Sequence, residues 1–246
     1  MRHLVRGIGG GPLLWALAAS ACRSGVDRPG EASTAARVLS ASEWSGDEGL
    51  AAAGDSLDAA TLLVPKEAWV LHIGDSFVDA SFKQNLAPRF RGVGARYVVR
   101  STTATYTTTW AYSPELDAML ARRPALVVVT LGANEFDITS PEQHARPIEI
   151  IARKIARAGA SCVWTSPPMW TADTGIVQVI HDHCAPCLFF DSDAVLGGLS
   201  SNERGGDRIH PNKQGGGRWA AAFWDWLTRH RDPAQGPWAL TPFERR

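Results

Sequence analysis

Short apolar runs alternate with longer, more polar stretches along the chain from residue 68 onward. Five of these runs are rich in β-branched or aromatic residues and are bounded by glycine, proline or polar residues, as is typical of strands. They cover residues 68–74, 96–100, 125–131, 161–165 and 188–191. Because stretches that can form helices separate these runs, the pattern predicts a mostly parallel five-stranded sheet with helices on both faces.

Local signals mark where helices begin. A helix is expected at about 77–90, directly after the first strand. Ser113-Pro114 predicts another, with the serine as N-cap and the proline at the first helical position. Ser140-Pro141 repeats this signal, and Gln143 is placed for a capping box at the start of a helix that ends near residue 158. The last helix is expected at 217–229, where large apolar residues form one stripe.

The first 21 residues have the pattern of a bacterial export signal. Two arginines precede an apolar stretch that is too short for a confident membrane span. The small residues before Cys22 resemble a lipoprotein cleavage site, which would leave Cys22 as the acylated first residue, although Ala19-Ser20-Ala21 also suits ordinary signal peptidase. We therefore expect a signal peptide at 1–21, a lipidated, flexible stalk at 22–60 and one folded domain at 61–246.

This organisation predicts an exported protein of the cell envelope that is anchored to the membrane by lipid, with a secreted or periplasmic protein as the alternative. The charge balance argues against a nucleic-acid partner. Basic and acidic residues number 25 each, and no basic stripe is visible. Walker-type loops and His-Glu-x-x-His are missing, and we expect neither a cofactor nor a metal.

Ser76 is the first candidate for chemistry. It ends the triplet Gly74-Asp75-Ser76, which directly follows the first predicted strand. Far downstream, Asp207 and His210 are three positions apart, so one turn of chain can place both side chains on the same face. A serine hydroxyl becomes an effective nucleophile when an imidazole takes its proton and a carboxylate orients that imidazole. These residues predict acyl transfer through a serine ester.

Asn134 is the second candidate. It lies just after the third predicted strand, in Leu131-Gly132-Ala133-Asn134-Glu135. An amide N–H at that point can donate to a developing oxyanion, which is worth about 3 kcal/mol in the transition state. Parallel sheets bind ligands at the carboxyl ends of their strands, where Ser76 and Asn134 both fall and to which a loop can bring His210.

The motifs Gly-Asp-Ser, Gly-x-Asn and Asp-x-x-His, in this order, resemble those of the SGNH (GDSL-type) hydrolase family between about Trp69 and Arg229. The resemblance implies a flavodoxin-like, three-layer α/β/α catalytic domain. It also implies a role for each matching residue: Ser76 as nucleophile and backbone oxyanion donor, Asn134 as side-chain oxyanion donor, His210 as base, Asp207 as its orienting carboxylate, and Gly74, Asp75 and Gly132 as supports of the site.

The chain departs from the family pattern at two places. Glu135 replaces the aspartate that usually follows the asparagine, which is expected to alter loop support rather than chemistry. The family's second block supplies a glycine whose N–H completes the oxyanion hole, and the corresponding stretch from Arg100 to Trp110 has no glycine. Glycine adopts every backbone angle at low cost, so the donor in this stretch stays open.

Simpler interpretations exist for each candidate. Gly54-Asp55-Ser56 repeats the triplet after a weak strand candidate, and we interpret it as part of a linker. Ser76 could cap a helix, His210 could be a surface residue before Pro211, and Asn134 could be a turn residue. The presence of all three motifs in order favours the catalytic interpretation.

Three further cysteines lie at Cys162, Cys184 and Cys187. Disulfides are the default in exported proteins, and either Cys184–Cys187 or Cys162–Cys187 is possible, with one thiol left over. His181-Asp182-His183 beside the last two cysteines also looks like a zinc cluster. The oxidising compartment favours the disulfide.

The substrate is the least determined part of the prediction. Trp110 and Trp170 are expected on the rim of the site, where they could stack on sugar rings, hold an acyl chain or only pack loops. We expect a serine esterase for short acyl esters, chiefly O-acetyl esters, on a small molecule or a polysaccharide. An O-acetyltransferase of envelope polysaccharide and a binding protein with a decayed site are the alternatives.

Overall fold

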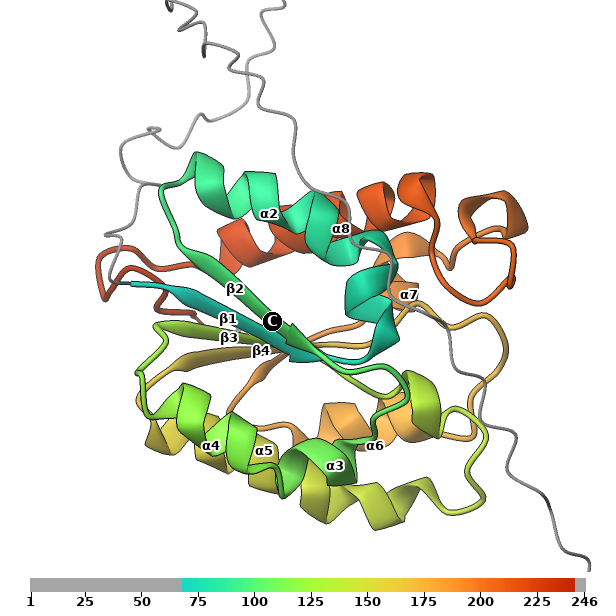
Figure 1. Cartoon of the computed structure of the whole chain (residues 1–246), viewed down its shortest axis with the longest axis horizontal. Coiled ribbons are helices and arrows are strands. Elements are labelled where there is room, and N and C mark those ends of the chain that lie inside the picture. The colour runs from blue at the N-terminus through green and yellow to red at the C-terminus, as the bar shows by residue number, and fades with distance from the viewer. Residues whose placement is uncertain (1–67, 242–246) are drawn as a thin grey trace, which may run out of the picture. The chain divides into compact units, whose positions relative to one another are not determined.

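A computed structural model describes residues 68–241 of the chain. Within this range five parallel strands form one sheet in the order β2-β1-β3-β4-β5 (Figure 1). The strands are β1 (Val70–Gly74), β2 (Tyr97–Ser101), β3 (Leu126–Thr130), β4 (Ser161–Thr165) and β5 (Leu188–Phe190). This is the order of flavodoxin-like folds. The predicted α/β class and parallel sheet are confirmed.

The predicted export signal, Cys22, the stalk and the second Gly-Asp-Ser triplet lie outside the described residues. None of the helices within residues 68–241 combines the length and the apolar character needed to cross a bilayer.

The central strands β1 and β3 are buried along their whole length, because helices cover both faces of the sheet. His72 is a polar residue inside β1. Its ring nitrogens lie 2.5 Å from the Tyr97 hydroxyl and 2.8 Å from Thr130 Oγ1, so both have partners. Burial lowers the pKa of His72 to about 3, and the ring is neutral.

One face of the sheet carries a π-helical turn (Val78–Phe82), α2 (Lys83–Gly92), α7 (Ser192–Leu196) and α8 (Lys213–His230) (Figure 1). The ring of Phe82 stacks on Trp219 with 3.7 Å between centroids. Trp219, Phe223 and Leu227 are fully buried, as the apolar stripe predicts. Helix α8 begins earlier than expected, because the Asn212 side chain caps it by accepting the N–H of Gln214 at 2.9 Å.

The opposite face carries α3 (Thr107–Ala111), α4 (Pro114–Leu120), α5 (Ala145–Arg157) and α6 (Ile176–His183) (Figure 1). Ser113 caps α4 as predicted, with its hydroxyl oxygen accepting the N–H of Glu115 at 3.1 Å. The prediction of a capping box at Ser140 is wrong. A 3-10 turn (Pro141–His144) precedes α5, and the Ser140 side chain makes no cap hydrogen bond.

A disulfide joins Cys162, in β4, to Cys187, just before β5, with 4.4 Å between the Cα atoms. It is the second of the two expected pairings, and Cys184 is the remaining thiol, buried and with its pKa raised by burial to about 12. The disulfide removes Cys187 from the alternative zinc set. Across residues 68–241 no group of three or more His, Cys, Asp or Glu side chains is arranged to hold a metal ion.

Candidate active site

The turn after β1 presents Ser76 at the carboxyl edge of the sheet. Gly74 is required by close approach, since a Cβ there would lie 2.5 Å from Val78 Cγ2 and closer still to the Thr130 carbonyl oxygen. Asp75 fixes the turn: its Oδ1 accepts the N–H of Phe77 at 2.9 Å. The main chain therefore holds the serine between a buried strand and the following helical turn.

Ser76, His210 and Asp207 form a continuous chain of hydrogen bonds. His210 Nε2 lies 2.8 Å from Ser76 Oγ, and His210 Nδ1 lies 2.6 Å from Asp207 Oδ2. The other carboxylate oxygen of Asp207 accepts the backbone N–H groups of Ile209 at 2.9 Å and His210 at 3.0 Å. The hydrogen bond with His210, joined by these backbone donors, lowers the pKa of Asp207 to about 2, so this carboxylate is ionised.

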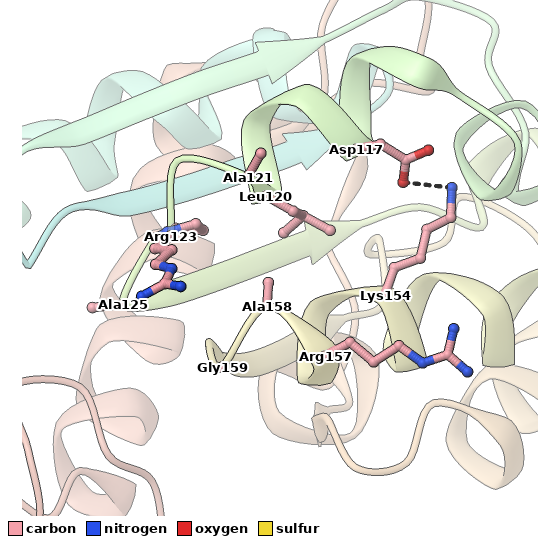
Figure 2. Close-up of a pocket in the computed structure, with 10 residues that line it drawn as sticks. Asp117, Leu120, Ala121, Arg123, Ala125, Lys154, Arg157, Ala158 and Gly159 are labelled. Atoms are coloured by element: carbon pink, nitrogen blue, oxygen red, sulfur yellow. Dashed lines mark ion pairs between the residues drawn. The ribbon is translucent and has the colours of Figure 1, made fainter.

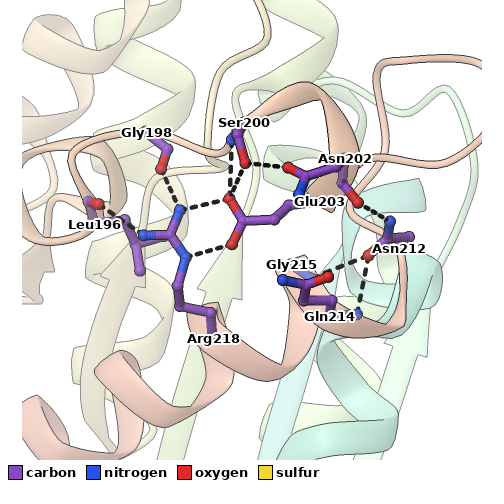
Figure 3. Close-up of polar contacts among 9 residues, drawn as sticks. All are labelled: Leu196, Gly198, Ser200, Asn202, Glu203, Asn212, Gln214, Gly215 and Arg218. Atoms are coloured by element: carbon purple, nitrogen blue, oxygen red, sulfur yellow. Dashed lines mark hydrogen bonds and ion pairs between the residues drawn. The ribbon is translucent and has the colours of Figure 1, made fainter.

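A network of charged and polar side chains supports the loop that carries Asp207 and His210 (Figure 3). Arg218, on α8, pairs with both carboxylate oxygens of Glu203, at 2.6 Å through Nε and 2.8 Å through Nη2. It also donates to the carbonyl oxygens of Leu196 and Gly198. Asn212 donates to the Asn202 carbonyl oxygen at 2.7 Å. The loop is thus fastened to the helix that follows it.

The buried side chain of Arg204 holds the same loop through hydrogen bonds. The side chain is buried, and its guanidinium donates to the carbonyl oxygens of Pro168 at 3.3 Å, Met169 at 2.5 Å and Ile209 at 2.5 Å. Ile209 directly precedes His210, whereas Pro168 and Met169 follow β4. Arg204 therefore fixes the position of His210 relative to the neighbouring strand-end loop.

The side chain of Asn134 lies at the adjoining strand end, in a 3-10 turn (Ala133–Glu135) after β3. Its Nδ2 donates to the Thr105 carbonyl oxygen at 2.8 Å and makes a longer contact of 3.4 Å with Asp75 Oδ2. An amide nitrogen carries two hydrogens, so one N–H is occupied by Thr105 and the second is weakly held. That second N–H is available to an oxyanion on Ser76.

Gly132 sets the direction of this turn. Its φ of 123° lies in the region that side chains rarely adopt, and a Cβ there would lie 2.7 Å from Ile180 Cδ1. A glycine is therefore needed both for the backbone angle and for the space beside α6.

The glycine-free second block contains a residue with glycine-like backbone geometry. Ala104 has a φ of 56°, a left-handed conformation that costs an alanine about 1–2 kcal/mol. It lies in the loop between β2 and α3, next to Thr105, whose carbonyl Asn134 binds. The backbone N–H of Ala104 is accordingly the candidate for the missing oxyanion donor.

Trp110 does not lie on the rim, contrary to the prediction. Its side chain is buried in α3, 3% exposed, and its Nε1 donates to Thr105 Oγ1 at 3.1 Å. The short helix α3, which no local signal announced, turns this side chain into the core. Trp110 is therefore a support of the second-block loop.

Trp170 is half-buried and belongs to an aromatic cluster beside the histidine. Its ring stacks on Phe77 with 5.6 Å between centroids and contacts Phe136 at 4.6 Å. Phe77 in turn lies 4.9 Å from the His210 ring. The partly exposed members of the cluster, Trp170 and Phe136, form an apolar wall next to Phe77, which contacts His210.

Two buried carboxyl groups, those of Asp75 and Glu135, lie beside Asn134. Burial raises the pKa of Asp75 to about 7, against the opposing effect of the Phe77 N–H, and nearby Glu135 raises it further. Burial also raises the pKa of Glu135 itself. Negative charge under an oxyanion would oppose its formation, and the raised pKa values favour the neutral forms.

A large pocket lies at the opposite edge of the sheet from Ser76 and His210 (Figure 2). It measures about 860 Å³ and lies where α4 and α5 end and β3 begins, lined by Asp117, Leu120, Ala121, Arg123, Pro124, Ala125, Lys154, Arg157, Ala158 and Gly159. Asp117 and Lys154 form an ion pair of 2.7 Å there. These lining residues include no serine, cysteine or histidine, so the candidate chemistry lies at the carboxyl edge.

The structure brings Ser76, Asn134, Asp207 and His210 to this one edge, where the sequence motifs suggested that they would meet. No motif or periodicity in the sequence marks Ala104 or Arg204 as a site residue. A left-handed alanine is invisible in a run of threonines, and a buried arginine is indistinguishable from a surface one before its partners are known.

Comparisons with solved structures agree with this arrangement. A lipolytic protein of the G-D-S-L family from Desulfitobacterium hafniense DCB-2 is 17% identical, covering 65% of this chain and 99% of that one, with a TM-score of 0.51. A carbohydrate esterase family 3 protein from Talaromyces cellulolyticus is 15% identical over 66% of this chain and 97% of that one, with a TM-score of 0.54. An acetyl esterase mutant with an acetate ion is 14% identical over 66% and 97%, also with a TM-score of 0.54.

The sequence itself matches no family model and no curated protein. At these identities the likeness establishes the fold, which is that of the SGNH (GDSL-type) hydrolases. The resemblance inferred from the three motifs is therefore confirmed at the level of the fold.

Proposed function

We propose that the protein is a serine esterase that hydrolyses short acyl esters, chiefly O-acetyl esters of carbohydrate, through an acyl-enzyme. The observation that carries this proposal is the hydrogen-bonded chain from Asp207 through His210 to Ser76, at 2.6 Å and 2.8 Å. A nucleophile, a base within reach of it and a group that orients the base are the parts that acyl transfer requires. The esterases among the structural neighbours support the same reaction class.

The proposed mechanism has two halves. His210 Nε2 takes the Ser76 proton as Oγ attacks the ester carbonyl, while Asp207 holds the resulting imidazolium. The backbone N–H of Ser76, the weakly held N–H of Asn134 and the N–H of Ala104 stabilise the oxyanion. His210 then protonates the leaving alcohol, and a water molecule, activated by the same histidine, releases the acid from Ser76.

Exposure of the base side supports a bulky alcohol portion in the substrate. The side chains of His210 and Asp207 are 31% and 47% exposed. An ester carried on a large sugar can reach such an open site, and the partly exposed ring of Trp170 offers an apolar face beside it. The carbohydrate esterase and the acetyl esterase among the neighbours favour acetyl groups on sugars.

We further propose that the protein acts outside the cytoplasm, held at the membrane through a lipid on Cys22. The disulfide between Cys162 and Cys187 supports an oxidising compartment. Metabolic labelling with a fatty-acid analogue, compared between the wild type and Cys22→Ser, tests the anchor. Equal labelling of the two proteins would refute it.

Hydrolysis of p-nitrophenyl acetate and butyrate and of an acetylated oligosaccharide by the purified protein tests the proposed reaction. We expect Ser76→Ala to abolish turnover, by about 10⁴-fold or more, with a nearly unchanged melting temperature. Acetate should be cleaved faster than butyrate.

Ser56→Ala is the matched control, because Gly54-Asp55-Ser56 repeats the triplet at another position. It should retain full activity. Turnover by Ser76→Ala would refute the assignment of the nucleophile. Acetyl transfer to an added glycan in place of water would indicate a transferase, and a folded wild type with no turnover would indicate a binding protein.

A further inference from the structure

The oxyanion side of the site depends on a loop that is strained and lacks a glycine. Ala104 adopts its left-handed φ of 56° in the segment between β2 and α3. An alanine remains in this conformation only where its surroundings determine it. The contacts that hold this loop therefore decide where the Ala104 N–H points.

Two consecutive residues of the turn after β3 bind this loop where it enters α3. Asn134 donates from Nδ2 to the Thr105 carbonyl oxygen at 2.8 Å. Glu135 accepts the backbone N–H of Thr107 on Oε1 at 2.6 Å. Asn134 is the residue expected to contact the oxyanion. Together with its neighbour Glu135, it binds the second-block loop on either side of Tyr106.

The link through Glu135 is buried and specific. Glu135 and Thr107 are both fully buried, so water does not compete for their hydrogen bond. Burial raises the pKa of Glu135, and the backbone N–H and side chain of Thr107 lower it. The other oxygen, Oε2, has no hydrogen-bond partner among residues 68–241, which leaves Oε1 as the oxygen that makes the contact.

His144 reinforces this link from a third element, the 3-10 turn that precedes α5. Its Nδ1 lies 2.6 Å from Thr107 Oγ1 and 3.4 Å from Glu135 Oε1, and its side chain is 14% exposed. Thr107 is therefore held through both its backbone and its side chain. Neither Glu135 nor His144 is in the hydrogen-bonded chain of Ser76, His210 and Asp207.

We infer that Glu135, with His144 behind it, is a positioning residue for the oxyanion hole: it fixes Thr107 and, with Asn134, sets the N–H of Ala104. This inference rests on the proposed esterase function. A glutamate reaches one methylene farther than the aspartate common in the family. It thereby anchors a loop whose own sequence provides no glycine.

The test compares Glu135→Ala and Glu135→Gln in the full-length protein with p-nitrophenyl acetate. Glu135→Ala removes the acceptor, and we expect kcat to fall about 10- to 100-fold, less than the loss of a whole oxyanion donor, with KM little changed. Glu135→Gln keeps an acceptor oxygen for the Thr107 N–H and should restore most of kcat. A merely structural role would lower the melting temperature without this separation of kcat from KM.

Glu149→Ala is the matched control, because Glu149 also pairs with a histidine, His183, at 3.0 Å, on a half-exposed surface of α5 and α6. It should leave kcat unchanged. Amide hydrogen exchange over residues 103–107 gives a readout that needs no turnover, and it should accelerate in Glu135→Ala and not in Glu149→Ala.

If Glu135→Ala fails to fold, Thr107→Pro replaces it. Proline lacks the N–H that Glu135 accepts and is well tolerated at the first position of a helix, which Thr107 occupies in α3. An unchanged kcat in a folded variant, or unchanged exchange over residues 103–107, would overturn the inference while leaving the esterase intact. Absence of serine-dependent turnover in the wild type would instead refute the proposed function, and the exchange comparison would still decide whether Glu135 holds the loop.

Discussion

The proposed base side of the site, at Asp207 and His210, and the proposed oxyanion side, at Asp75, Asn134 and Glu135, are built by different physical means. On the base side, Asp207 is 47% exposed, and hydrogen bonds lower its pKa to about 2. On the oxyanion side, Asp75 and Glu135 are fully buried, and burial raises both pKa values. An ionised carboxylate near solvent orients the His210 ring, whereas buried carboxyl groups hold backbone N–H groups in place.

The two sides also share a feature. Each contains a non-glycine residue with a left-handed backbone, Arg208 with a φ of 62° and Ala104 with a φ of 56°. Such strain persists only where neighbouring contacts over-determine the conformation. The difference therefore lies in what holds the strained loop. On the base side the loop is held by the ion pair of Arg218 with Glu203 and by the buried Arg204. On the oxyanion side it is held by Glu135 and Asn134.

Among the variants that compare the two sides, Asp207→Asn should produce the largest effect, because it removes the charge that holds His210. We expect kcat to fall about 10³- to 10⁴-fold, since an amide stabilises the imidazolium poorly and favours the wrong tautomer of His210. Steady-state kinetics with p-nitrophenyl acetate measures this. Asp182→Asn is the control, as Asp182 lies 2.8 Å from the His181 ring but away from any serine in the proposed site. A near-normal rate in Asp207→Asn would make Asp207 merely structural.

Asp75→Asn tests the charge state of the oxyanion side. The pKa of Asp75 is about 7 in the folded protein and about 3.8 when exposed in the unfolded chain. The folded state therefore keeps a proton that the unfolded state loses, and this contribution to stability declines as pH rises from about 4 to about 7. The decline is at most about 1.4 kcal/mol per pH unit.

Because asparagine does not titrate, Asp75→Asn should lack this decline. Urea unfolding at several pH values compares the two proteins. The charged groups that act on Asp75 are Glu135 and Asp79, and both raise its pKa. Parallel stability profiles of variant and wild type between pH 4 and 7 would show that Asp75 is ionised throughout, contrary to the prediction.

Arg204→Met should destabilise the base side more than Arg218→Met. Arg204 is buried, and its removal leaves the carbonyl oxygens of Pro168, Met169 and Ile209 without this donor, which should cost about 2–3 kcal/mol of unfolding free energy. Arg218 is 41% exposed, so water can replace it at a cost of about 1 kcal/mol. Urea denaturation ranks the two, and the reverse order would refute the internal role of Arg204.

Ala104→Gly should have the smallest effect, and of the opposite sign. Glycine adopts the left-handed conformation freely, so we expect a gain of up to about 1 kcal/mol after the greater flexibility of the unfolded chain is counted. Ala111→Gly, in the buried part of α3, is the control and should lose about 1 kcal/mol. A loss of stability in Ala104→Gly would mean that the alanine side chain contributes packing that outweighs its strain.

The sequence predicted the sheet and the residues of the proposed catalytic chain for the same reason. Buried strands need continuous apolar runs, and strand ends in a parallel sheet converge, so Ser76 and Asn134 had to lie near each other. The spacing of Asp207 and His210 is local and therefore visible in the chain.

The supports of the site were not predictable in this way. Glu135 binds Thr107 across 28 positions, and Arg204 binds Met169 across 35. Neither contact follows from a period or a turn signal. The predicted start of α5 was wrong for a related reason. Ser140 has the right neighbours for a capping box, but its backbone, with φ of −138° and ψ of 77°, leads into a 3-10 turn and its side chain makes no cap.

The disulfide between Cys162 and Cys187 closes the connection from β4 to β5 into a covalent ring spanning 25 positions. Trp170 lies on this ring, and so do two of the three carbonyl groups that Arg204 binds, those of Pro168 and Met169. A single proteolytic cut anywhere inside it would open the ring without releasing a fragment. Trp170 would then remain connected to both β4 and β5, so a nicked molecule would keep the parts of the proposed site together.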